Sequence, residues 1–239
     1  MSTTASSPQS PPCEPTSPRG PAALLLIDIQ NDFCEGGALA VPEGSHVVPL
    51  ANALRAARPW DLVVLSQDWH PPSHASFAVN NPGAALFSLV SLPSGDEQVM
   101  WPAHCVQGSR GAEFHSDLHR APADVVVQKG SIVSVDSYSA FGDAFQSRFE
   151  NTGLNKLLRD KGVTYVVVVG LALDFCVNYT CLDARRLGFV TYLVLSGCRA
   201  VYPANADKVV KDLEAVGVIV VKDVKDLPEE VFPPGSSLA

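Results

Sequence analysis

Residues 164–169 read Thr-Tyr-Val-Val-Val-Val, a short continuous run of β-branched and aromatic residues. Runs of similar character occur earlier in the chain, at Ala22–Ile29, Leu62–Ser66 and Asp124–Val127. Apolar runs of about four to eight residues without alternation are typical of strands that are buried on both faces of a parallel sheet. The four runs therefore predict a parallel β-sheet that is covered by helices on both sides.

Segments with helical spacing of apolar residues lie between the expected strands. We expect helices at Val47–Ala57, Leu154–Lys161, Asp174–Leu187 and Ala206–Val216, and further strands at Phe189–Leu195 and Val218–Val221. Gly170 is expected to break the strand before it, and Asn205 is the candidate N-cap of the last helix. Strands that alternate with helices imply right-handed crossovers, so the expected fold is a three-layer αβα sandwich with a mainly parallel, six-stranded sheet.

The composition and the two ends of the chain limit the class of protein. The chain has 239 residues, which suits one α/β domain, expected at residues 22–232. Residues 1–21 are rich in Ser, Thr and Pro and are expected to form a disordered tail, and residues 233–239 a loose C-terminus. The formal net charge of -8 argues against nucleic acid or an anionic membrane as a partner.

Sequence motifs that the chain lacks also bear on its expected location and on its cofactor. No apolar run approaches the roughly 20 residues that a membrane span needs, and no signal-peptide core is evident, so a cytoplasmic location is expected. The six cysteines are scattered, which favours free thiols over a disulfide framework. The chain lacks the glycine-rich signatures of dinucleotide and nucleoside-triphosphate sites, which argues against those cofactors.

A residue that can do chemistry follows each of the four apolar runs. Asp28 closes the first run, Asp68 and His70 follow the second, Lys129 follows the third, and Cys176 follows the fourth. In parallel α/β sheets, ligands bind outside the carboxyl ends of the strands. We therefore expect these side chains to gather at one edge of the sheet and to form a catalytic site there.

Cys176 is the candidate nucleophile, because it falls at the expected start of a helix, where partial positive charge and free N–H groups stabilise a thiolate. The alternative is a small buried core cysteine. Lys129 is the natural partner for Asp28, and in a Cys–Asp–Lys cluster it would lower the pKa of the thiol while Asp28 accepts the thiol proton. Alternatively, Asp28 caps a turn and Lys129 is a surface residue.

Asp68 and His70 are spaced as metal ligands, because residues i and i+2 of a strand point to the same side. The third ligand is left open by spacing alone: His104 lies in the long loop, and His74 is closer in sequence. Carboxylate and imidazole ligands suit zinc, iron(II) or manganese.

Aromatic residues lie in the expected loops after the strand ends. Phe33, Trp69, Tyr138 and Phe141 could form a wall around a flat, apolar substrate, although ordinary anchoring of loops is the alternative. The segment from Pro71 to about Ala121 is long for a connection and rich in Pro, Gly, Ser and His, which is typical of a functional excursion.

Several motifs together resemble the nicotinamidases of the isochorismatase-like cysteine hydrolase superfamily. They are Leu26-Ile27-Asp28-Ile29-Gln30-Asn31-Asp32-Phe33, Gln67-Asp68-Trp69-His70-Pro71, Trp101-Pro102-Ala103-His104-Cys105-Val106-Gln107-Gly108, Gln128-Lys129-Gly130, Tyr138-Ser139-Ala140-Phe141 and Gly170-Leu171-Ala172-Leu173-Asp174-Phe175-Cys176-Val177. The Asp, Lys and Cys motifs belong to the superfamily at large, whereas the Asp-Trp-His and Trp-Pro-x-His-Cys pair is more specific to nicotinamidases.

The resemblance implies roles for individual residues. It implies a catalytic triad of Asp28, Lys129 and Cys176, and an oxyanion hole formed by the backbone N–H groups of Ala172 and Cys176, with a cis peptide bond before Ala172. It implies the metal ligands Asp68, His70 and His104, and so selects His104 over His74. The substrate-binding aromatics are expected to be Phe33, Trp69 and Tyr138.

The resemblance also implies an activity. We expect hydrolysis of nicotinamide to nicotinic acid and ammonia through a cysteine thioester, in NAD salvage, with pyrazinamide as a further substrate. One divalent ion is expected, zinc first, with iron or manganese as alternatives, and a homo-oligomer is compatible with the sequence. Leu173 and Phe175 depart from the Thr and Tyr of the family pattern. The rival interpretations are a related cysteine hydrolase acting on another amide or carbamoyl compound, and a non-catalytic binding protein.

Overall fold

The structure, a computed structural model, describes residues 20–91, 97–142 and 152–231. Residues 1–19 of the expected tail lie outside the described residues, and the expected C-terminus at residues 233–239 also lies outside them. Pro21 belongs to the fold, because its carbonyl accepts a hydrogen bond from the Thr164 N–H at 2.9 Å. Pro21, which the sequence assigns to the tail, thus contacts the described fold.

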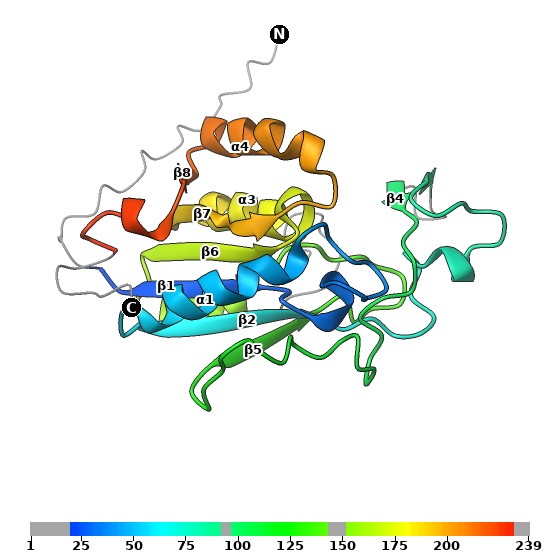
Figure 1. The fold of residues 1–239 in the computed structure, drawn as a ribbon, viewed down its shortest axis with the longest axis horizontal. Coiled ribbons are helices and arrows are strands. Elements are labelled where there is room, and N and C mark those ends of the chain that lie inside the picture. Colours follow the sequence, from blue (N-terminus) through cyan, green and yellow to red (C-terminus); the bar gives the residue numbers. More distant parts are fainter. Residues whose placement is uncertain (1–19, 92–96, 143–151, 232–239) are drawn as a thin grey trace, which may run out of the picture.

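Six strands form one sheet within the described part of the chain, in the order β5–β2–β1–β6–β7–β8, and every neighbouring pair is parallel (Figure 1). Their bounds are β1 Ala22–Ile27, β2 Leu62–Asp68, β5 Val125–Lys129, β6 Tyr165–Leu171, β7 Val190–Arg199 and β8 Ile219–Val221. The sheet that the apolar runs predicted is confirmed.

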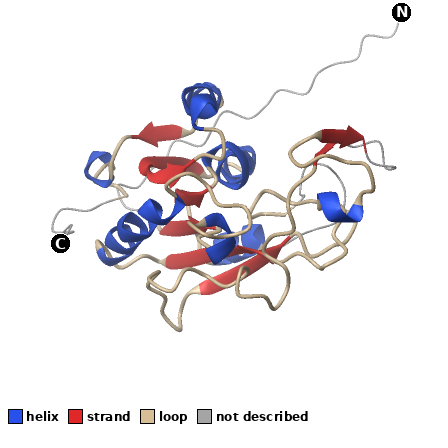
Figure 2. Cartoon of the chain, turned by 45° about the vertical axis from the view of Figure 1, so that its right-hand side comes forward, coloured by secondary structure: helices blue, strands red, loops and turns tan. Residues whose placement is uncertain are grey.

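Helices cover both faces of this sheet, as Figure 2 shows. Helix α1 (Val47–Ala56) packs on one face, while α2 (Leu154–Asp160), α3 (Asn178–Arg186) and α4 (Ala206–Ala215) pack on the other. Successive side chains of a strand point to opposite faces, so Leu24 of β1 lies in the first core and Leu25 in the second. Both faces are buried, which is why the strands are continuously apolar, and the expected three-layer sandwich is confirmed.

Some local expectations were wrong. Gly170 does not end its strand: β6 runs through it to Leu171, and at φ 131° it packs against the Ile27 backbone, where a side chain would collide. The helix expected from Asp174 begins as a π-helical turn at Leu173–Val177 before α3. Asn205 occupies the N-cap position of α4 but makes no capping hydrogen bond, because its backbone is helical (φ -92°, ψ -8°) rather than extended.

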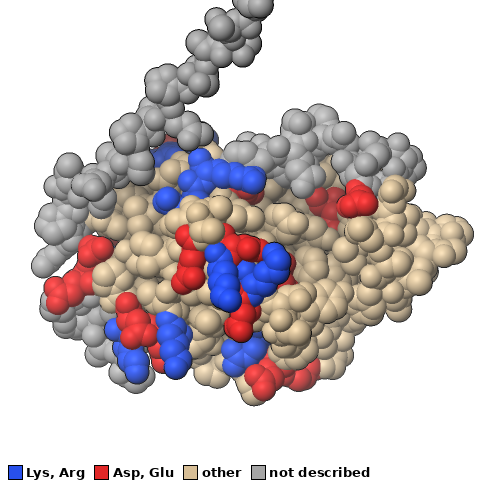
Figure 3. All heavy atoms as spheres, turned by 90° about the horizontal axis from the view of Figure 1, so that it is seen from above, with Lys and Arg blue, Asp and Glu red and all other residues tan. Residues whose placement is uncertain are grey.

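The chain between β2 and β5 forms an excursion from the carboxyl-end edge of the sheet, on the right in Figure 1. It contains an antiparallel hairpin of β3 (Leu89–Ser91) and β4 (Glu97–Val99). The sequence carries no Lys, Arg, Asp or Glu between Asp68 and Asp96, and the corresponding side of the surface in Figure 3 is largely uncharged. Among the described residues, no helix is long and apolar enough to cross a membrane.

Candidate active site

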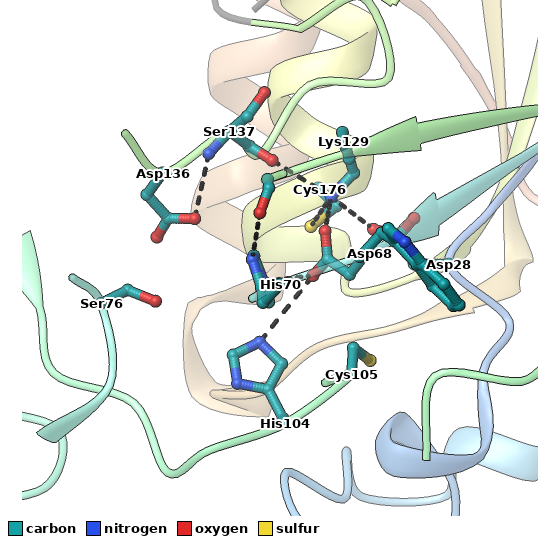
Figure 4. Close-up of polar contacts among 12 residues, drawn as sticks. Asp28, Asp68, His70, Ser76, His104, Cys105, Lys129, Asp136, Ser137 and Cys176 are labelled. Carbon is teal, nitrogen blue, oxygen red and sulfur yellow. Dashed lines mark hydrogen bonds and ion pairs between the residues drawn. The ribbon is translucent and has the colours of Figure 1, made fainter. Parts of the chain in front are cut away.

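The carboxyl ends of four parallel strands bring the expected reactive residues together (Figure 4). Asp28 directly follows β1, Asp68 and Lys129 end β2 and β5, and Cys176 lies in the turn after β6. Asp68 and Lys129 are also register partners across the two strands, which places their side chains on the same face. The predicted meeting of these residues at one edge of the sheet is confirmed.

The Lys129 ammonium group is the centre of a buried polar cluster. Its Nζ lies 2.9 Å from Asp28 Oδ2 and 3.3 Å from Cys176 Sγ, and it also pairs with Asp68 Oδ1. Nζ donates a further hydrogen bond to the Ser137 carbonyl at 3.2 Å. The side chain is fully buried, and its pKa is raised well above the usual value, because the two carboxylates outweigh the effect of burial, which alone would lower it. Lys129 is therefore a fixed positive charge and not a surface residue.

Asp28 is held at the end of β1 with a left-handed backbone, at φ 46°. Its Oδ1 accepts a hydrogen bond from Ser66 Oγ at 2.6 Å, and its backbone N–H donates to the same hydroxyl at 3.2 Å. Burial raises the pKa of Asp28, and this effect exceeds the lowering by Lys129. A carboxyl group with a raised pKa is a stronger base than an ordinary carboxylate and is better suited to accept and return a proton.

Cys176 lies in the π-helical turn that follows β6, within 4.8 Å of carboxylate oxygens of Asp28 and Asp68. Burial raises the pKa of its thiol well above the usual value; Lys129 lowers it, and the two carboxylates raise it again. The expectation that Lys129 lowers the thiol pKa therefore holds only for its own contribution, because burial outweighs it. In this state the sulfur carries its proton, and a nearby base is needed to activate it.

A second set of side chains, which could bind a metal ion, faces the same space. We call these three residues, Asp68, His70 and His104, the donor group. Their ligand atoms all lie within 4.8 Å of one another, and all three residues are buried. The Nε2 atoms of His70 and His104 lie 3.4 Å and 3.8 Å from Asp68 Oδ2.

The hydrogen bonds behind the two histidines orient these rings for a metal ion. Nδ1 of His70 contacts the Gly130 carbonyl at 2.9 Å, and Nδ1 of His104 contacts the Pro102 carbonyl at 2.8 Å. Because a carbonyl only accepts, each Nδ1 carries a hydrogen, and the Nε2 lone pair is left for an ion in the neutral form of each ring. Burial lowers the pKa of His70, but the Asp68 carboxylate raises it above its usual value, so metal binding there would release a proton. One carboxylate and two such imidazoles fit zinc, iron(II) or manganese.

The charges around this donor group also favour a cation. Burial alone would raise the pKa of Asp68, but Lys129 and then His70 hold it well below its usual range. Burial, reinforced by the charge of His70, lowers the pKa of His104 to about 4, so His104 is neutral at pH 7. An ionised carboxylate beside a neutral imidazole is the form in which both bind metal.

His74, the rival third ligand, lies beside this group with its ring centroid 4.3 Å from that of His70. Its Nε2 contacts the Val135 carbonyl at 3.1 Å, so the hydrogen sits there. Its Nδ1 lone pair faces the Ser76 hydroxyl at 2.8 Å. This arrangement supports His104 rather than His74 as a ligand.

The cysteine and the donor group share one pocket of about 350 Å³, counting the part that is open to solvent. Its lining residues are mostly apolar: Phe33, Leu39, Asp68, His70, Trp101, His104, Asp136, Tyr138, Ala172, Phe175, Cys176 and Val201. A small, flat molecule with a few polar atoms suits such a pocket.

The expected aromatic wall is only partly reproduced. Phe33 and Tyr138 line the pocket, whereas Trp69 is not among the described lining residues and packs against the core. Trp69 lies between Asp68 and His70, so its side chain points to the opposite side of the chain from theirs. Trp101 and Phe175 line the pocket as well, with ring centroids 5.0 Å apart in an edge-to-face contact.

The turn that carries Cys176 contains the expected cis peptide bond. The peptide bond Leu171–Ala172 is cis, and both Ala172 and Cys176 line the pocket. Asp174 holds this turn to the neighbouring loop, because its carboxylate accepts hydrogen bonds from the backbone N–H groups of Val201 and Tyr202 at 2.9 and 2.8 Å.

Sequence reasoning missed several residues that support the site. The buried Gln30 side chain accepts a hydrogen bond from the Asp68 N–H at 2.8 Å and donates one to the Asp68 carbonyl at 2.9 Å. These two bonds fix the backbone of Asp68, the residue that supplies the carboxylate of the donor group. Ser66 orients Asp28, and the Ser137 carbonyl orients Lys129. A buried polar residue inside an apolar run, as for Ser66, was the signal that could have identified one of them.

Residues 22–223 match the Isochorismatase domain, and the chain belongs to the isochorismatase family. Within that family, the chain is similar to several nicotinamidases and, at 26% identity, to a ureidoacrylate amidohydrolase of Pseudomonas savastanoi pv. phaseolicola. A nicotinamidase of Escherichia coli K12 is 44% identical over 201 residues, which cover 82% of this chain and 92% of that protein.

Solved structures agree in fold over most of the chain. A nicotinamidase and pyrazinamidase of Acinetobacter baumanii has a TM-score of 0.80 at 39% identity and covers 86% of this chain and 98% of its own. A pyrazinamidase of Pyrococcus horikoshii in complex with zinc has a TM-score of 0.68 at 32% identity and covers 84% and 98%.

Proposed function

We propose that this protein is a nicotinamidase that hydrolyses nicotinamide to nicotinic acid and ammonia, with pyrazinamide as a second substrate. The observation that carries the proposal is the shared pocket, in which Cys176 faces a carboxylate–imidazole donor group across a small apolar space. The side chains of Phe33, Trp101 and Tyr138 in the pocket lining would contact a planar aromatic ring. In the cell, the reaction would recycle nicotinamide into NAD synthesis.

In the first half of the reaction, Asp28 takes the proton from the Cys176 thiol as the sulfur attacks the carboxamide carbon. The negative charge then develops on the carboxamide oxygen, next to the backbone N–H groups of Ala172 and Cys176. Asp28 returns the proton to the nitrogen, the carbon–nitrogen bond breaks, and ammonia leaves a thioester on Cys176.

In the second half, Asp28 accepts a proton from water, and the water oxygen attacks the thioester carbon. The carbon–sulfur bond breaks, the sulfur recovers a proton, and nicotinic acid leaves. Lys129 keeps its charge throughout and holds Asp28 and Cys176 at 2.9 Å and 3.3 Å from its Nζ. Its contribution is to fix the geometry of the base and the nucleophile, because the proton moves between those two.

Asp68, His70 and His104 are the residues that would hold a divalent ion, for which we propose zinc. When bound, the ion would supply a Lewis-acidic contact for the nitrogen lone pair of the pyridine or pyrazine ring. A substrate without a ring nitrogen has no evident use for this donor group, which favours pyridine carboxamides over other amides.

The test is ammonia release from nicotinamide by the purified, zinc-loaded protein, beside Cys176→Ala and beside a chelator-treated sample. We expect turnover by the wild type, loss by at least about 10³-fold in Cys176→Ala, and a lower kcat/KM after chelation. Benzamide, which lacks the ring nitrogen, serves as the matched substrate and should be hydrolysed poorly. Full activity of Cys176→Ala would refute the mechanism, and equal activity on benzamide would refute the role of the donor group.

A further inference from the structure

A buried glutamine connects the β3–β4 hairpin to the wall of the pocket. Gln98 lies in the middle of β4, and only 6% of it is exposed, although both neighbours in the strand are more open. Its Nε2 donates to Asp136 Oδ2 at 2.7 Å and to the Val99 carbonyl at 2.9 Å, and it lies 3.4 Å from the Tyr138 hydroxyl. One side-chain amide therefore contacts two residues that line the pocket.

The segment from Asp136 to Tyr138 is held from two sides. On the hairpin side, Trp101 Nε1 donates to the Tyr138 hydroxyl at 3.1 Å. On the catalytic side, Asp136 Oδ1 accepts from the Ser137 N–H at 3.0 Å, and the Ser137 carbonyl accepts from Lys129 Nζ at 3.2 Å (Figure 4). The segment thus joins the hairpin to the centre of the catalytic cluster.

The tyrosine ring forms part of the surface that a substrate ring would contact. Tyr138 packs against Phe175, with ring centroids 5.5 Å apart, and both side chains line the pocket. The chain here is a loop, and Tyr138 is held by the hydrogen bonds at its hydroxyl and at the neighbouring Asp136 together with stacking of its ring on Tyr179 of α3 at 5.2 Å. A shift of this loop would move the aromatic wall.

We propose that Gln98 is a positioning residue, which acts through Asp136 and Tyr138 to set the place of the substrate ring. The inference rests on the proposed function, since it assigns a role in binding nicotinamide. The sequence has no Lys or Arg between Asp68 and Asp96, and the hydrogen-bond donor to the Asp136 carboxylate is the neutral amide of Gln98. Gln98 therefore binds this carboxylate without adding a positive charge next to the pocket.

The first test compares Gln98→Leu with Glu97→Gln, a matched change at the exposed neighbouring position of the same strand. Losing a hydrogen bond to a charged group typically weakens an interaction by roughly tenfold or more. We therefore expect Gln98→Leu to raise the KM for nicotinamide about tenfold while kcat changes by less than about threefold, and Glu97→Gln to match the wild type.

A double variant that restores the hydrogen bond with donor and acceptor exchanged distinguishes a positioning role of Gln98 from a general loss of stability. Gln98→Glu places a second carboxylate against Asp136, and we expect a larger rise in KM than in Gln98→Leu. Adding Asp136→Asn reverses donor and acceptor, since the new amide can donate to the new carboxylate while its oxygen still accepts from the Ser137 N–H. The double variant should recover most of the KM lost in Gln98→Glu, and the rescue is informative even where Gln98→Leu does not fold.

The outcomes separate this inference from the proposed function. An active wild type whose KM is unchanged in Gln98→Leu and Gln98→Glu would overturn the role of Gln98 and leave the nicotinamidase proposal standing. Additive effects in the double variant would also overturn it, because they would show that the two side chains act independently. A zinc-loaded wild type without activity on nicotinamide would overturn both proposals.

Discussion

Replacing Lys129 by Met should produce a loss of stability that grows with pH. The ammonium group pairs with two buried carboxylates, and its Nζ lies 2.9 Å from Asp28 Oδ2. At an effective dielectric constant of about 20, a single contact at this distance is worth about 6 kcal/mol before desolvation. Breaking a buried ion pair by removing one partner typically costs about 3–5 kcal/mol, so we expect Lys129→Met to lower the free energy of unfolding by that amount near pH 8.

The pH dependence follows from the pKa of Asp28, which is already raised by burial in the presence of Lys129. Without the lysine, this pKa rises further above that of the unfolded chain. A group with a raised folded pKa contributes stability that is complete below its unfolded pKa and is lost as the pH rises through its folded pKa. The penalty of Lys129→Met should therefore be smaller near pH 5, by about 2 kcal/mol, since each pKa unit corresponds to about 1.4 kcal/mol.

Urea unfolding followed by circular dichroism, with a chelator present at both pH values, measures this difference. Lys156→Met is the matched control, because Lys156 pairs with Asp160 at 2.5 Å on the surface and is 80% exposed. Exposed pairs contribute at most about 1 kcal/mol, so the control should stay near the wild type at both pH values. A Lys129→Met penalty below about 1 kcal/mol, or one that is the same at both pH values, would refute the reasoning.

Three further predictions concern the donor group and the nucleophile turn. His104→Ala should weaken zinc binding by more than about 100-fold in a competition with a chromophoric chelator; unchanged affinity would exclude His104 as a ligand. Gly130→Ala introduces a methyl group against the His70 ring at a backbone φ of 66°. It should lower the free energy of unfolding by about 1–3 kcal/mol and also weaken zinc binding. A wild-type melting temperature would contradict the close contact between Gly130 and the His70 ring. Asp174→Ala leaves the Val201 N–H without its acceptor. We expect it to lower the free energy of unfolding by about 1–3 kcal/mol and to raise the KM for nicotinamide. A loss of stability with an unchanged KM would show that the loop at Val201 does not shape the pocket.

The catalytic cluster could be predicted because of a general property of parallel sheets. Whatever the order of the strands, their carboxyl ends share one edge, so Asp28, Asp68, Lys129 and Cys176 had to lie near that edge. The order β5–β2–β1–β6 then makes them neighbours, and strand order is a property of packing that single runs do not encode. The bounds of the expected helices and strands agreed within four residues, with the largest differences at the end of β7 and the start of α3, and the β3–β4 hairpin was not expected.

The supporting residues could not be predicted, because their partners are distant in sequence. Ser66 contacts Asp28 across 38 positions, and Gln98 contacts Asp136 across another 38. A Ser or Gln in an ordinary stretch of sequence carries no pattern that names its hydrogen-bond partner. Trp69 lies between two expected metal ligands in the sequence, so its side chain points away from theirs, and its role in substrate binding stays a prediction.

The αβα class, the edge of the sheet at which the reactive groups meet, and the residue types available for nucleophile, base and metal ligands can all be predicted from the chain alone. They follow from hydrophobic periodicity and from strand direction, which are local properties of the chain. The protonation of these groups, in contrast, depends on packing. Burial raises the pKa of the Cys176 thiol beyond what Lys129 can offset, and the charge of Lys129 keeps Asp68 ionised. Both effects depend on desolvation and on distances of a few ångström between groups from different strands, and those exist only once the strands are packed.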